Sequence, residues 1–261
     1  MVTRNALKLA LCLALGIIAP SFASESGKLA SRAQASLKAG KFAKGYSQLE
    51  RALIASRREA DIKSEIRIFI AMAQVRTMSL DFDFADSLLS NIHYDDALDT
   101  PTKTMLIKAK MGLGNATEKY GDAVTLCESI SEDELDNLDD ELQGVFYSEC
   151  AIAYAGAHRE DKAQQALKMV GKRLDDDTGI YYWTKARTMD LQGKNDADMF
   201  YHKAESESVK SHTAYTTANI VYHRAKYLKK TNPTASKSFF ERCKTAFELM
   251  GLQKNSARCT E

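Results

Sequence analysis

Residues Lys38–Leu53 read KAGKFAKGYSQLERAL, and the spacing of small and bulky residues within this stretch indicates the fold. Gly45 is followed four positions later by Leu49 and three positions after that by Ala52. Steps of four and three residues place these side chains on one face of a helix. Two helices approach closely where one of them lacks bulk, so Gly45 marks a predicted crossing and Leu49 fills the space one turn on. The stretch therefore predicts the second helix of a helix hairpin.

The same pattern recurs along the chain at intervals of 40, 38, 40, 34 and 39 residues. The small residues are Gly45, Ala85, Ala123, Ala163, Ala197 and, in the faintest copy, Ser236. The larger residues that follow them are Leu49, Leu89, Cys127, Leu167, Tyr201 and Phe240. Amphipathic segments precede several of the copies, as at Arg67–Met78, Val145–Gly156 and Tyr215–Leu228. Because the chain has only three prolines and few segments alternate with period two, we expect an all-α protein of about six helix hairpins.

This arrangement resembles the tetratricopeptide repeat (TPR) family over roughly residues 28–250. The family period is about 34 residues, and four of the five intervals here are longer, so we expect longer connections near 95–100 and 132–140. The resemblance implies a right-handed solenoid of hairpins, whose first helices line a concave surface that binds a partner. The best-matching positions are Gly40-Lys41-Phe42, Gly45, Leu49 and Ala52-Leu53.

The N-terminus has the features of a secretory signal. Arg4 and Lys8 precede an apolar run at Leu9–Ala19, and small residues follow at Ser21 and Ala23. The run is short for a membrane span, so we predict a signal peptide, residues 1–23, that is cleaved after Ala23. A retained membrane anchor is the alternative. The predicted solenoid then occupies 24–251 and a tail occupies 252–261.

Composition narrows the classes of partner. Hydrophobic residues make up 44% of the 261-residue chain and charged residues 27%, as in ordinary globular proteins. Removing residues 1–23 takes away two basic residues and no acidic one, which changes the formal net charge from +1 to −1. A nucleic-acid binder normally needs a basic excess, so we expect no nucleic acid as partner. Membrane contact is expected only through an uncleaved signal sequence or a partner.

Four cysteines remain after the predicted cleavage: Cys127, Cys150, Cys243 and Cys259. Export to an oxidising compartment and an even count favour two disulfides. Cys127 and Cys150 fall on helices that are neighbours in the predicted stack, and a bond between Cys243 and Cys259 would hold the C-terminal tail. The alternative is four reduced cysteines that fill core space.

The predicted binding groove is centred on two first helices. Trp183 and Arg187 lie one helical turn apart, and Tyr222 and Lys226 repeat this spacing in the next hairpin. Aromatic side chains offer large contact areas, while Arg and Lys bind carboxylates. We predict that a peptide or protein partner contacts these residues. Burial of Trp183 between hairpins is the alternative.

The sequence contains none of the common catalytic, phosphate-binding, dinucleotide-binding or zinc-binding motifs. Its histidines do not fall at metal-ligand spacing, and we expect no metal and no cofactor. The predicted function is that of a non-enzymatic protein–protein interaction scaffold or adaptor in the cell envelope, either periplasmic or secreted. A helical hydrolase of envelope polymers with a site in the groove is one alternative, and a self-assembling structural subunit is another.

Overall fold

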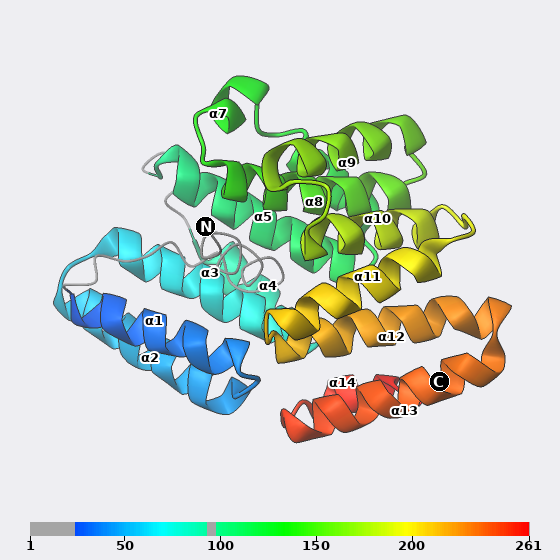
Figure 1. The fold of residues 1–261 in the computed structure, drawn as a ribbon. Coiled ribbons are helices and arrows are strands. Elements are labelled where there is room, and N and C mark those ends of the chain that lie inside the picture. Colours follow the sequence, from blue (N-terminus) through cyan, green and yellow to red (C-terminus); the bar gives the residue numbers. More distant parts are fainter. Residues whose placement is uncertain (1–23, 93–97, 261) are drawn as a thin grey trace, which may run out of the picture. The chain divides into compact units, whose positions relative to one another are not determined.

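The computed structural model describes residues 24–92 and 98–260, and within these ranges all regular structure is helical. The predicted signal peptide, residues 1–23, lies outside the described residues. Fourteen helices are present in the described ranges, and consecutive helices pack in pairs as hairpins (Figure 1). The all-α prediction is therefore confirmed. No described helix combines the length and the apolar character that crossing a membrane requires.

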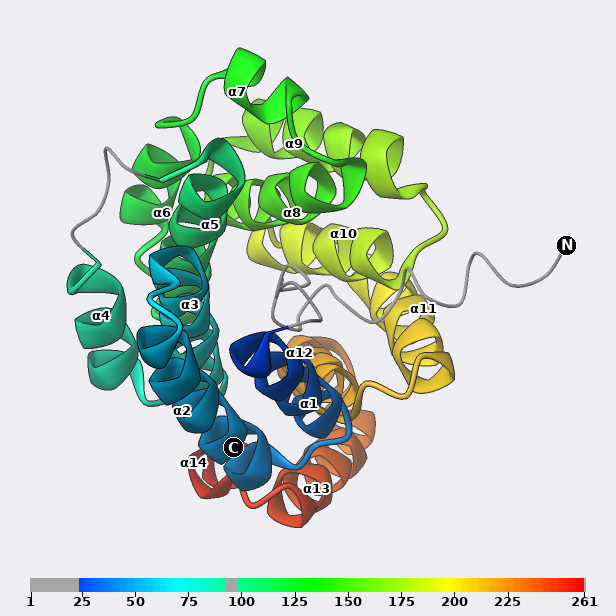
Figure 2. The ribbon, with the colours of Figure 1, turned by 90° about the vertical axis from the view of Figure 1, so that its left-hand side faces the viewer.

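Contacts between Cα atoms divide the chain into two compact units, and the N-terminal unit ends at Leu138. Within it, α1 pairs with α2, α3 with α4 and α5 with α6, while α3 also packs against α2 and α5 (Figure 2). Ser24 caps α1, because its side-chain oxygen accepts a hydrogen bond from the amide of Gly27 at 3.0 Å. The helices of this unit are α1 (Glu25–Lys38), α2 (Phe42–Arg58), α3 (Ile62–Met78), α4 (Phe82–Ser90), α5 (Thr100–Ala116), α6 (Tyr120–Cys127) and α7 (Glu132–Asp136).

The C-terminal unit begins at Asp139 and has the same organisation. Helix α8 pairs with α9, α10 with α11 and α12 with α13, and α10 packs against α8 and α9 of the preceding hairpin. The short helix α14 packs on α13. The helices of this unit are α8 (Asp140–Gly156), α9 (Glu160–Leu174), α10 (Gly179–Leu191), α11 (Ala197–Lys210), α12 (Ala214–Thr231), α13 (Pro233–Leu249) and α14 (Gln253–Arg258).

The residues of the repeating pattern are buried in every hairpin, as the helix-crossing argument predicts. The small residues Ala85, Ala123, Ala163 and Ala197 are each 0% exposed. Gly45 lies against α1, where an added Cβ would meet Leu37. The larger residues of the pattern are buried too: Leu49, Leu89, Cys127, Leu167, Tyr201 and Phe240. The pattern therefore marks the close contact between the two helices of each pair.

The turn between the two helices has the same backbone conformation in five hairpins, although not every one of these turns contains glycine. In each turn the second residue after the first helix has a positive φ, and these residues are Gly40, Leu80, Glu118, His158 and Gly193. The next amide donates to the carbonyl five residues earlier, as from Lys41 to Ser36 and from Arg159 to Tyr154. This is the hydrogen bond of a Schellman motif. Only two of the five positions are glycine, so residues with a Cβ adopt the left-handed conformation at the other three.

Substitution of Gly45 by alanine is expected to destabilise the protein, although alanine is the better helix former. The new Cβ would lie 2.5 Å from Cγ of Leu37 and 3.3 Å from the carbonyl oxygen of Ala33, so the Leu37 side chain or α1 itself must shift. Overpacking of this kind costs about 1–3 kcal/mol, while the helix propensity of alanine offsets about 1 kcal/mol. We expect a net loss of about 1 kcal/mol in the free energy of unfolding, measured by urea denaturation.

Gly121→Ala on α6 is the matched control for this substitution. No atom lies within 4 Å of a Cβ built at this position, so only the gain in helix propensity remains. We expect this variant to be more stable than the wild type by up to about 1 kcal/mol. If Gly45→Ala and Gly121→Ala changed the free energy of unfolding in the same direction, the interpretation of Gly45 as a close helix crossing would be contradicted.

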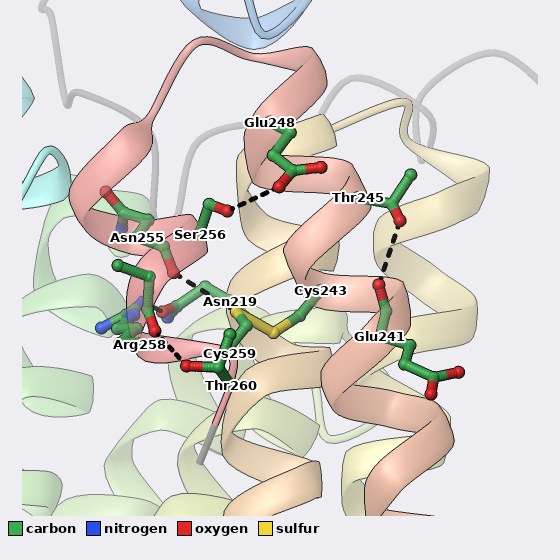
Figure 3. The surroundings of a disulfide bond; sticks show 11 residues. Asn219, Glu241, Cys243, Thr245, Glu248, Asn255, Ser256, Arg258, Cys259 and Thr260 are labelled. Carbon is green, nitrogen blue, oxygen red and sulfur yellow. Dashed lines mark hydrogen bonds between the residues drawn. A yellow bond between two sulfur atoms is a disulfide. The ribbon is translucent and has the colours of Figure 1, made fainter.

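All four cysteines of the described residues are disulfide-bonded, which gives two disulfides. Cys243 on α13 is bonded to Cys259, and their Cα atoms are 6.1 Å apart (Figure 3). Cys127 and Cys150 are the other two bonded cysteines. Disulfides persist in oxidising compartments, so this bonding indicates a location outside the cytoplasm.

The segment expected to be a tail after Gly251 contains the helix α14 instead. Gly251 does end α13, with a φ of +73°, as its sequence position predicts. Beyond it, Leu252 is 7% exposed and Cys259 2% exposed. The hydroxyl of Ser256 also hydrogen-bonds to the Glu248 carboxylate at 3.2 Å (Figure 3). The disulfide, this hydrogen bond and the buried side chains hold the C-terminal segment on α13.

Candidate functional site

Trp183 lies in the core of the C-terminal unit. Thr178 caps α10 by accepting a hydrogen bond from the amide of Tyr181, and the helix then carries Trp183 inward. The indole is 6% exposed and lies 6.2 Å from the Tyr201 ring, measured between centroids. The rest of its cluster consists of Ala186, Ala197, Ala204 and Ile220. Of the two interpretations left open by the sequence, the observed environment of Trp183 corresponds to burial between hairpins.

Arg187 lies one turn after Trp183, with its guanidinium carbon 6.0 Å from the indole centroid. Its Nη1 donates to the Asp190 carboxylate at 2.9 Å, and the hydroxyl of Tyr201 donates to the same carboxylate oxygen at 2.8 Å. Burial raises the pKa of Tyr201 above its ordinary value, so the phenol stays protonated and keeps donating. Asp190 thereby joins α10 to α11 and partly compensates the charge of Arg187.

Tyr222 on α12 carries two cations near its ring. The guanidinium carbon of Arg258 lies 4.0 Å from the ring centroid, and the ammonium of Lys226 lies 5.8 Å from it. Tyr222 itself is 8% exposed, whereas the Lys226 side chain is exposed to solvent. Arg258 comes from α14, next to the disulfide-bonded Cys259. The C-terminal segment thus supplies one cation of this group.

His223 lies beside the aromatic residue of each predicted pair, Trp183 of the first pair and Tyr222 of the second. Its ring lies 5.3 Å from Trp183 and 5.0 Å from Tyr222, measured between centroids. Burial lowers the pKa of His223 well below its ordinary value, and the positive charges of three neighbouring cations lower it further. The imidazole is therefore neutral at pH 7. We call the following six residues the aromatic–cation cluster: Trp183, Arg187, Tyr222, His223, Lys226 and Arg258.

The four residues predicted from the sequence thus lie around one histidine that sequence reasoning did not select. His223 directly follows Tyr222, but its partner Trp183 is 40 positions away in the chain, and no local pattern joins them. Arg258 was missed because it follows the glycine that ends α13. It lies on α14, next to Cys259, whose disulfide with Cys243 joins this segment to α13.

The two acids with the most strongly lowered pKa values lie in the N-terminal unit, at helix starts. Burial opposes ionisation of Asp99, but hydrogen bonds from Lys63 and Thr102 lower its pKa to about 2. A hydrogen bond from Lys103 is the largest cause that lowers the pKa of Glu134 to about 2. Both carboxylates are ionised at pH 7 and stabilise the starts of α5 and α7. Their chemistry is that of capping groups.

The aromatic–cation cluster combines positive charges with buried aromatic rings, and Lys226 is its exposed member. Within residues 24–92 and 98–260, no group of three His, Cys, Asp or Glu side chains is arranged to hold a metal ion. A cation near an aromatic ring is attracted by the ring's electron density, which helps to hold Lys226 and Arg258 in position. Of the three cations, Lys226 is exposed to solvent, whereas Arg187 and Arg258 are partly buried.

The described residues define the class of this protein: an all-α protein of paired helices with two disulfides. Comparison of the chain with models of known protein families finds no match. Comparison with curated proteins finds none either.

Proposed function

We propose that this protein is a non-enzymatic interaction scaffold of the cell envelope, built as a TPR-like right-handed solenoid. It is exported by the N-terminal signal, which is cleaved after Ala23, and it binds a peptide or protein partner in the periplasm or outside the cell. The export step is supported by the disulfides and by Ser24, which would cap α1 as the first residue after cleavage. The sequential hairpins and their buried small residues support the repeat assignment.

The observation that carries the binding proposal is the aromatic–cation cluster. Its members come from α10 and α12, which are the first helices of successive hairpins, and from α14. First helices of such repeats line the surface that faces a partner. Lys226 is the exposed member of the cluster. A partner bound at the cluster should therefore lie within reach of position 226.

Site-specific photocrosslinking tests this function without disturbing the buried residues. Lys226 is replaced by benzoylphenylalanine in one variant, and the exposed Lys230 at the end of the same helix is replaced in a matched control. Irradiation of the source's envelope fraction should give a discrete crosslinked protein at position 226, and little of it at position 230. Identical products at both positions would contradict a binding surface at the cluster. Turnover of an envelope polymer by the purified protein would favour the enzyme alternative.

A further inference from the structure

A second group of aromatic and basic side chains lies on the surface of the hairpin formed by α10 and α11. Positions 180–183 of α10 read IYYW, so the apolar residues of this helix extend beyond the one stripe that faces the core. Trp183 is buried, whereas Tyr181 and Tyr182 are partly exposed. Phe200 of α11 is partly exposed as well. Three aromatic side chains of this hairpin therefore keep some contact with solvent.

The three side chains form one continuous aromatic surface. The Tyr182 ring lies 6.0 Å from the Tyr181 ring and 6.5 Å from the Phe200 ring, measured between centroids. Tyr182 and Phe200 also pack against the buried cluster around Trp183, which holds them in position. Met199, which precedes Phe200, is 49% exposed. Rings that are fixed and partly open to solvent can contact the apolar face of a ligand at little cost in conformational entropy.

Two lysines flank these rings, and neither forms an ion pair with any of the described residues. The ammonium of Lys185 lies 4.3 Å from the Phe200 centroid and 5.6 Å from the Tyr181 centroid. The ammonium of Lys203 lies 5.2 Å from the Tyr182 centroid and 5.6 Å from that of Phe200. Such contacts are weak at exposed sites, so an anionic ligand can pair with the lysines and gain access to the rings. We call the following five residues the aromatic–lysine patch: Tyr181, Tyr182, Lys185, Phe200 and Lys203.

Acidic residues lie near the Tyr182 end of the patch. Burial is the largest cause that raises the pKa of Tyr182, and the negative charges of Asp177, Glu207 and Asp176 raise it further. Glu207 is paired with Lys210, which leaves the two aspartates without an ion pair among the described residues. An anionic lipid surface would be repelled by these carboxylates. A sugar hydroxyl, in contrast, can donate hydrogen bonds to them.

The numbers of rings and charges also distinguish a glycan from a nucleic acid. Single-stranded nucleic acids stack on aromatic side chains, but they carry a phosphate on every nucleotide and bind along strongly basic grooves. The patch has two lysines, and Asp176 and Asp177 lie close enough to act on Tyr182. The C–H face of a sugar packs on an aromatic ring without any charge, and a sugar carboxylate pairs with a lysine. The patch therefore fits a hydroxyl-rich chain that bears carboxylates.

We propose that the aromatic–lysine patch binds an acidic glycan, with sugar rings packed on Tyr182 and Phe200 and sugar carboxylates paired with Lys185 and Lys203. The patch shares no residue with the aromatic–cation cluster. The inference therefore goes beyond the proposed function and does not depend on it. Binding of this kind would attach the protein to a polysaccharide outside the cytoplasm.

Isothermal titration calorimetry of the purified protein tests the charged part of the site. The ligand is an oligogalacturonate, and the matched ligand is its full methyl ester, which keeps the sugar chain and removes the charges. We expect the ester to bind at least about tenfold more weakly. The double variant Lys185→Gln/Lys203→Gln should bind the acid form about tenfold more weakly than the wild type. Lys237→Gln on α13, an exposed lysine that contacts no ring within the described residues, should leave the affinity unchanged.

Tyr182→Leu tests the aromatic part of the site. Leucine keeps an apolar side chain against the core but removes the flat ring, so we expect binding of the acid form to weaken by about fivefold. Urea denaturation of the same variant establishes that the protein remains folded. The lysine variants change side chains on the surface and test the patch even if Tyr182→Leu is unstable.

Several outcomes would overturn the inference. They are equal affinities for the acid and the ester, no binding of the acid form, an equal loss from the lysine double variant and Lys237→Gln, or an unchanged affinity in folded Tyr182→Leu. Tighter binding of an oligothymidylate, a Glu–Gly repeat peptide or phosphatidylglycerol vesicles would assign the patch to another class of ligand. Photocrosslinking at position 226 reports on the aromatic–cation cluster, so the proposed function and this inference can fail separately.

Discussion

Replacement of Trp183 by alanine should lower the free energy of unfolding by about 4 kcal/mol. The indole is 6% exposed and packs against Tyr201, His223 and the small residues of α11, so its removal leaves a cavity and removes apolar burial. Because the substitution also removes the only tryptophan, unfolding in urea is best followed by far-ultraviolet circular dichroism.

Lys226→Ala is the control, since its side chain is exposed and forms no ion pair within the described residues. It should change the free energy of unfolding by no more than about 0.5 kcal/mol. A loss below about 1 kcal/mol in Trp183→Ala would contradict burial and would make the indole available to a partner. The expected loss means that a binding experiment on Trp183→Ala would measure damage to the core together with any loss of contact.

The second large effect is expected from the disulfide between Cys243 and Cys259. The double substitution Cys243→Ser/Cys259→Ser should lower the free energy of unfolding by about 3 kcal/mol, because the bond closes a loop in the unfolded chain between residues 16 positions apart. It should also reduce the hydrogen-exchange protection of α14, which contains only six residues and is too short to be stable alone. Urea denaturation and hydrogen exchange followed by mass spectrometry measure the two effects.

Thr245→Ala is a suitable control because Thr245 is an exposed residue of α13 whose hydroxyl bonds within its own helix, to the Glu241 carbonyl at 3.1 Å (Figure 3). This variant should match the wild type in both measurements. Unchanged protection of α14 in the double variant would show that the buried side chains Leu252 and Asn255 hold the segment without the disulfide.

The helix pairs were predictable because their signal is local. A small residue at Ala163 with Leu167 and Val170 at steps of four and three defines one buried helix face, whatever helix packs against it. Helix ends with strong cap chemistry were predictable for the same reason. Ser131 starts α7 with a capping box, and Pro233 occupies the first turn of α13.

The shared hairpin turn was not predictable from residue type. Leu80, Glu118 and His158 adopt a positive φ that residues with a Cβ normally avoid. They do so because the Schellman hydrogen bond and the packing of the two helices favour that turn. Only at Gly40 and Gly193 does the sequence itself signal the conformation.

The sequence by itself determined the paired helices and the small side chains that let them approach closely, because both depend on spacings of a few residues. Tertiary structure alone decided that Trp183 lies inside the C-terminal unit, that His223 stands between it and Tyr222, and that Arg258 returns onto Tyr222. Helical periodicity places a residue on an apolar face, but burial depends on which distant helices cover that face. The aromatic–cation cluster exists because α10 packs against α12 and because α14, packed on α13, brings Arg258 to Tyr222.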